Sequence, residues 1–151
     1  MHEVPQLLSA NMNEAQLVAN TTEIIKTGGW VRNRLVTDDG RHCILGAIGK
    51  ARWGHQWDMD CMTGMVAVCK RLGEDPVASA VVRRVREHLV ASHQQSADRW
   101  TVLSHCAEGE YPGHHDQTVV YQWNDYNTNY EELLDVLGKV QAEVGLPHES
   151  F

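Results

Sequence analysis

Cys43 is the residue of this sequence whose position first suggests chemistry. It stands between the turn signal Asp39-Gly40 and an apolar segment, ILGAI, that predicts the start of a helix. The positive end of a helix dipole lowers the pKa of a thiol and can make it a nucleophile. Cys43 is therefore a candidate catalytic nucleophile.

A Cys-dependent hydrolase or transferase would also need a base and a group that orients the base. His105 or His114 could serve as the base, and Asn124 or Asp125 as the orienting group. The chain has nine histidines, so such a match arises easily. Cysteine is also among the most buried residue types. The apolar residues after Cys43 favour a buried wedge in the core over a nucleophile.

The segment HCAEGEYPGHHDQ (105–117) offers a second kind of chemistry, because its polar side chains are zinc-ligand types. The spacing fits no common zinc pattern, and adjacent histidines point apart in an extended chain. A solvated polar loop is the alternative interpretation. The candidate ligands are His105, Cys106, His114, His115 and Asp116.

Two further groups of residues could bind a partner. Arg83, Arg84 and Arg86 could meet phosphates, but the net charge of −7 makes a nucleic-acid partner the less favoured interpretation. The five tryptophans could be binding hot spots or core fillers, and we expect most of them in the core with one or two at a rim.

Asn124 and Asp125 precede the last predicted helix. Their simplest role is turn chemistry, in which Asx side chains bond to the nearby backbone. The stronger alternative is a buried polar anchor that ties the last helix to the helix after Cys43.

The elements that must position these residues are mostly helices. Four predicted helices have clear signals. The first starts at Asn11 or Asn13 and ends at Gly28-Gly29, and the second is a short helix after Cys43. The third starts at Asp75-Pro76, and the last has a capping box at Thr128 and Glu131. Gly46 and Gly49 in the short helix indicate that another element packs closely against it.

Two other segments complete the expected fold. A helix over 61–72 would be capped by Asp60 and would place Met62, Met65, Val66 and Cys69 on its core face. Residues 117–123 have the composition of a strand, with a helix as the alternative. The sequence thus predicts a mainly α fold, a compact single domain of about five helices with at most a few short strands.

Composition sets the remaining expectations. A chain of 151 residues with 42% hydrophobic residues can bury a core without disulfides or metals. We expect one domain over 1–151, with residues 1–10 flexible and 93–116 an irregular polar loop. The sequence has no secretory signal and no apolar stretch near the roughly 20 residues that span a bilayer. Reduced cysteines and a cytoplasmic location are therefore expected.

Two segments together resemble a known family. DDGRHCILGAIGKA resembles the D-x-G-x-x-C-x-x-G-A segment of small proteins from actinobacteria and their phages, a domain-of-unknown-function family of the DUF6197 type. WNDYNTNYEELLDVL resembles the family's second segment. The resemblance implies a compact, mainly helical fold and no particular activity. The matching positions are Asp39, Gly40, Cys43, Gly46, Ala47, Trp123, Asn124, Asp125, Thr128 and Glu131.

Three functional hypotheses follow. The leading one is a small non-enzymatic protein-interaction module without a cofactor, encoded by a phage and acting on a host protein. The alternatives are the Cys43-dependent enzyme and a zinc-binding protein that uses the 105–116 loop. The oligomeric state is left open.

Overall fold

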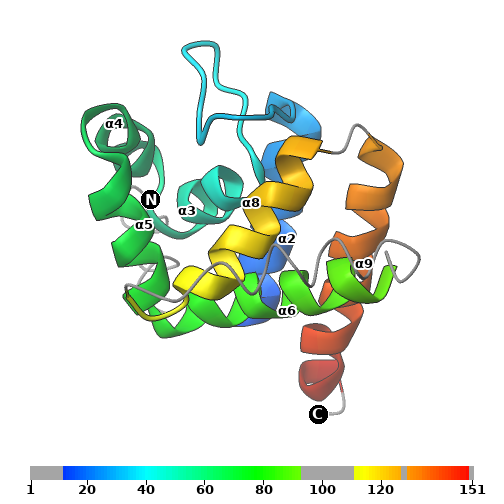
Figure 1. The fold of residues 1–151 in the computed structure, drawn as a ribbon. Coiled ribbons are helices and arrows are strands. Elements are labelled where there is room, and N and C mark those ends of the chain that lie inside the picture. Colours follow the sequence, from blue (N-terminus) through cyan, green and yellow to red (C-terminus); the bar gives the residue numbers. More distant parts are fainter. Residues whose placement is uncertain (1–11, 93–110, 127–128, 150–151) are drawn as a thin grey trace, which may run out of the picture.

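The computed structural model describes residues 12–92, 111–126 and 129–149 of the chain. This part is mainly helical, as predicted, but it has seven helices rather than about five, and no strand (Figure 1). The helices are α2 (Glu14–Gly28), α3 (Ile44–Trp53), α4 (His55–Thr63), α5 (Met65–Glu74), α6 (Pro76–Ser92), α8 (His114–Tyr126) and α9 (Tyr130–Glu149).

All seven helices contribute side chains to one hydrophobic core. The helix α2 packs against α3 and α9, while α6 crosses the bundle and contacts α8 and α9. Figure 1 shows α3 between the α4–α5 pair and α8. Within the described ranges, none of the helices is long and apolar enough to cross a bilayer.

The predicted helix over 61–72 is wrong in its boundaries. Gly64 has extended backbone angles and divides the segment into α4 and α5. Asp60 therefore lies inside α4 instead of capping a helix. The break also rotates the apolar residues, so that Val68 and Leu72 face the core while Met62 and Met65 face solvent.

Two helices begin at capping residues that the sequence predicted. Asn13, one of the two predicted starts, caps α2 by accepting from the backbone N–H of Gln16 at 2.8 Å. Asp75 caps α6 as predicted and accepts from Ala78 N at 2.8 Å. These caps satisfy backbone donors that a helix leaves unpaired in its first turn.

The cap of α9 lies one residue later than predicted. Asn129 Oδ1 accepts from Glu132 N at 3.0 Å, in place of the expected pair Thr128 and Glu131. Glu131 is exposed in the first turn of the helix, and Thr128 lies outside the described residues.

Residues 117–123 are part of helix α8, so the strand interpretation is wrong and the helical alternative is correct. Gln117, Val120 and Trp123 are buried at helical spacing, and this tertiary packing outweighs the β-propensity of TVVY. The helix also takes in His114–Asp116, the end of the predicted irregular loop. Residues 1–10 and the remainder of that loop up to residue 110 lie outside the described residues.

The glycines of α3 confirm the predicted close packing. A Cβ atom on Gly46 would lie 1.9 Å from the backbone oxygen of Leu35, and one on Gly49 would lie 2.0 Å from the ring of Trp57. Only a residue without a side chain fits at these two contacts.

We predict that Gly46→Ala lowers the free energy of unfolding by about 1–3 kcal/mol, because Leu35 presents backbone that must move. Gly138→Ala in α9 is the matched control. Nothing lies within 4 Å of its Cβ position, and alanine there should raise stability by roughly 0.5–1 kcal/mol. Urea denaturation measures both changes. Equal effects of the two substitutions would contradict the close packing of α3.

Candidate functional site

Asn124 joins three segments through its buried amide. Its Oδ1 atom accepts hydrogen bonds from the indole Nε1 of Trp30 at 2.6 Å and from the backbone N–H of Ile44 at 3.0 Å. Its Nδ2 atom donates to the backbone oxygen of Val31 at 3.0 Å. The side chain is fully buried, at 0% exposure. The predicted polar anchor is therefore present, but it lies in α8 and not beside the last helix.

Asp125 holds the neighbouring loop. Its Oδ1 atom accepts from the backbone N–H of Asn33 at 2.7 Å, and Asn33 has a left-handed φ of +68°. The stacked rings of Trp30 and Trp123, 6.0 Å apart, add an apolar contact beside these bonds. Residues 30–34 are thus fixed against the C-terminal turn of α8.

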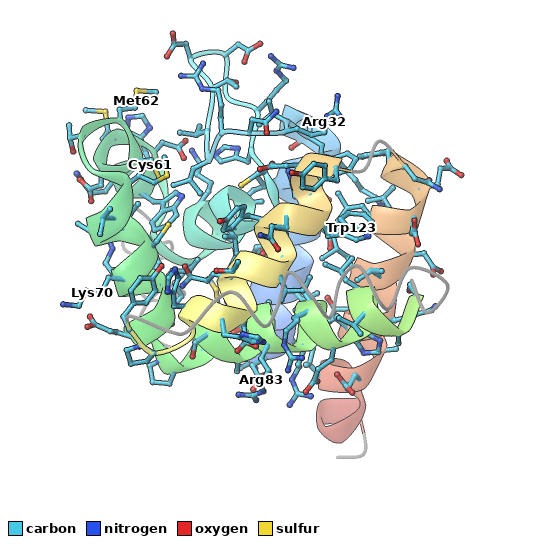
Figure 2. The ribbon with its side chains drawn as sticks, viewed as in Figure 1. Arg32, Cys61, Met62, Lys70, Arg83 and Trp123 are labelled. Carbon is cyan, nitrogen blue, oxygen red and sulfur yellow. The ribbon has the colours of Figure 1, made fainter. Side chains whose placement is uncertain are left out.

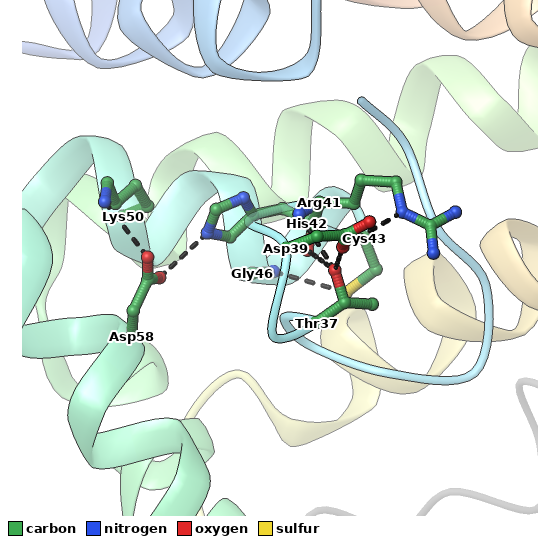
Figure 3. Close-up of polar contacts among 8 residues, drawn as sticks. All are labelled: Thr37, Asp39, Arg41, His42, Cys43, Gly46, Lys50 and Asp58. Carbon is green, nitrogen blue, oxygen red and sulfur yellow. Dashed lines mark hydrogen bonds and ion pairs between the residues drawn. The ribbon is translucent and has the colours of Figure 1, made fainter. Parts of the chain in front are cut away.

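The segment before α3 is a tight turn (Figure 3). Thr37 N–H donates to Arg41 O at 2.9 Å, and Gly40 takes a φ of +87° that favours glycine. Asp39 accepts from the Thr37 hydroxyl and from Arg41 Nε. These bonds, that from Thr37 above all, lower the pKa of the Asp39 carboxyl. The turn places Cys43 at the start of α3.

Cys43 is the N-cap residue of α3, and its side chain is buried in the core. Its Sγ atom accepts from the backbone N–H of Gly46 at 3.3 Å (Figure 3), and only 4% of the residue is exposed. Burial raises the pKa of the thiol to about 12 despite the helix start. Ala47, one turn further, is fully buried. The geometry matches the wedge interpretation.

A buried histidine that the sequence did not single out adjoins this turn. His42 Nε2 lies 2.8 Å from Asp58 Oδ1, and Asp58 Oδ2 accepts from Lys50 Nζ at 3.0 Å (Figure 3). These contacts join the turn, α3 and α4. They depend on Gly54, which ends α3 with a left-handed φ of +77°.

A cavity of about 360 Å³ lies between α5, α8 and the loop at residues 33–35. Cys43, His114 and Asp125, which were candidates for one catalytic site, all line it. The other lining residues are Asn33, Arg34, Leu35, Leu45, Met65, Val66, Cys69, Tyr111, Gln117 and Tyr121.

A second cavity of about 280 Å³ adjoins the first and shares Asn33, Arg34, Leu35 and Met65 with it. Beside it, four large apolar side chains of α4 and α5 are exposed, and Figure 2 shows Met62 at the outer end of α4. We term them the methionine surface: Met59 (54% exposed), Met62 (58%), Met65 (60%) and Val66 (76%).

The predicted zinc ligands do not form a site in the part that the structure covers. His105 and Cys106 lie outside the described residues. His114 stacks on Tyr111 at 4.5 Å, and Asp116 forms an ion pair with Arg86 at 2.6 Å. Among the described residues, no three His, Cys, Asp or Glu side chains could share a metal ion.

The arginines of α6 mostly connect helices. Arg84 pairs with Glu14 of α2 at 2.6 Å and with Glu143 of α9 at 3.1 Å. Arg83 is exposed on the lower edge of α6 (Figure 2). These ion pairs leave α6 without a continuous basic face.

The tryptophans follow the expected division between core and rim. Trp57 and Trp123 are buried, while Trp30 and Trp53 are partly buried. Trp53 stacks on Trp57 with ring centroids 5.4 Å apart, across the helix break at Gly54. Trp100 lies outside the described residues.

Comparison with known proteins gives one match. No curated protein and no solved structure matches the chain significantly. The model of a family of unknown function, DUF6197, matches residues 10–143, a range that includes both segments of the resemblance. The chain therefore belongs to the DUF6197 family, whose function is not known.

Proposed function

We propose that this chain is a protein-interaction module and that its partner docks on the methionine surface. The observation that supports this proposal most is the exposure of four large apolar side chains on two consecutive short helices. Contiguous apolar patches are uncommon on proteins that stay free, and they often mark interfaces.

The residue types of the methionine surface fit this role. Methionine is flexible and polarisable, and it adapts to the shape of a bound surface. The helix break at Gly64 turns Met62 and Met65 outward, so their exposure follows from the backbone path. The neighbouring cavities would admit side chains of a partner. A phage origin and a host protein as partner are predictions that rest on the resemblance alone.

We predict that replacing Met62, Met65 and Val66 together with serine abolishes capture of a stoichiometric partner from actinobacterial lysates. Stability should change little, because the three side chains are exposed. Val90→Ser is the matched control, since Val90 is exposed on α6. Quantitative pull-down with the wild type and both variants tests the proposal. Equal capture by the triple variant and the control would refute docking on this surface.

The Cys-dependent enzyme is the second candidate function. The cavity that Cys43, His114 and Asp125 share is the observation in its favour. The raised pKa of Cys43, about 12, argues against it, because the thiol stays protonated at neutral pH. An enzyme of this class needs a thiolate or a base that takes the proton during the reaction.

Alkylation with iodoacetamide separates the two candidates. We predict that Cys43 in the folded protein reacts far more slowly than a free cysteine, whose pKa is about 8.5. Raising the pH from 7 to 9 should leave Cys43 unlabelled, since its folded pKa of about 12 lies above this range. Peptide mapping reads each cysteine separately, and labelling in urea is the control. Rapid labelling of folded Cys43 at pH 7 would favour the enzyme.

A further inference from the structure

We propose that the cavity of about 360 Å³ between α5 and α8 binds a small amphiphile with an apolar chain and a terminal carboxylate, the chemistry of a medium-chain fatty acid. Met65 and Val66 belong both to the methionine surface and to the lining of this cavity. The proposed ligand would occupy the interior of the cavity, whereas the proposed protein partner would contact the exposed faces of α4 and α5.

The volume and the floor of the cavity suit an apolar chain. A volume of about 360 Å³ falls in the range of roughly 300–1,000 Å³ that small-molecule sites occupy. Its floor includes Cys43 and Leu45, both nearly inaccessible to solvent. Met65, Val66 and Cys69 of α5 form one wall. An apolar chain would bury these groups without leaving a polar atom unpaired.

The polar side chain deepest in the α8 wall already has its partners. Gln117 is buried, donates to the backbone oxygen of Cys69 at 2.8 Å and accepts from the Tyr111 hydroxyl at 2.9 Å. Both its amide nitrogen and its amide oxygen therefore have a hydrogen-bond partner without a ligand. The part of the wall at Gln117 therefore suits an apolar ligand body.

Arg34 supplies the charge that selects a carboxylate. It lines both cavities and is exposed. In the described part of the chain its guanidinium takes part in no ion pair, whereas Arg52, Arg71 and Arg84 each pair with a carboxylate. A guanidinium is well suited to bind a carboxylate through two hydrogen bonds.

Asp125 is the charge that competes with Arg34. Its Oδ1 atom already accepts from the backbone N–H of Asn33 at 2.7 Å and from Asn124 Nδ2 at 3.3 Å. The bond from Asn33 holds the loop that carries Arg34. Asp125 therefore acts as a support of the loop, and Arg34 provides the charge that the ligand meets.

Calorimetric titration with hexanoate, heptanoate and octanoate tests the proposal. Affinity should rise about fourfold for each added methylene, the factor that about 0.8 kcal/mol gives. Octanoate should bind more tightly than octanol or octylamine. Tighter binding of octylamine would mean that Asp125 selects the ligand and would overturn the carboxylate class. No binding of any of these probes would overturn the site.

Two controls locate the binding. Arg34→Gln should weaken octanoate up to about fivefold and leave octanol unchanged, while Arg83→Gln on the far edge of α6 should change neither. Octanoate should also slow the alkylation of Cys69, which lines this cavity. An unchanged alkylation rate of Cys69 at saturating octanoate would place the ligand elsewhere and contradict the proposal. Arg34 is not part of the methionine surface, so Arg34→Gln should leave capture of a protein partner unaffected, and the two proposals fail separately.

Discussion

The buried amide of Asn124 is the interaction on which the rest of this structure depends. It is the point where α8, the start of α3 and the segment at residues 30–31 meet. No water reaches this side chain, so each donor and acceptor around it must be satisfied by protein. Such a network tolerates few alternatives, because a buried polar group without a partner costs about 1–3 kcal/mol. These hydrogen bonds therefore fix the orientation of α8 relative to the start of α3, in addition to the apolar packing between them.

The two segments that carry the family resemblance meet at this amide. The first brings the turn at Asp39-Gly40 and the buried thiol of Cys43, and the second brings Asn124 and Asp125. Cys43 and Asp125 also line the larger cavity. The family segments thus contribute to the frame of the cavity, and they place the Cys43 thiol in buried surroundings that raise its pKa.

Much of this arrangement could be predicted from local signals. The caps at Asn13 and Asp75 marked helix starts, and the small residues of α3 indicated close packing. The errors arose where tertiary contacts override local preference. A single glycine at residue 64 turned a predicted core stripe outward, and burial made a helix of the β-branched residues at 117–123. The cavities and the contact between His42 and Asp58 were beyond prediction, because they depend on how helices meet.

A double-mutant cycle between Trp30 and Asn124 tests most directly whether this amide organises the fold. Trp30→Phe removes the indole donor, and Asn124→Ala removes its acceptor, which lies 2.6 Å away in the intact protein. Urea denaturation of the wild type, both single variants and the double variant gives their coupling free energy. We predict a coupling of about 1 kcal/mol or more. Additive effects, with a coupling within roughly 0.3 kcal/mol of zero, would contradict it.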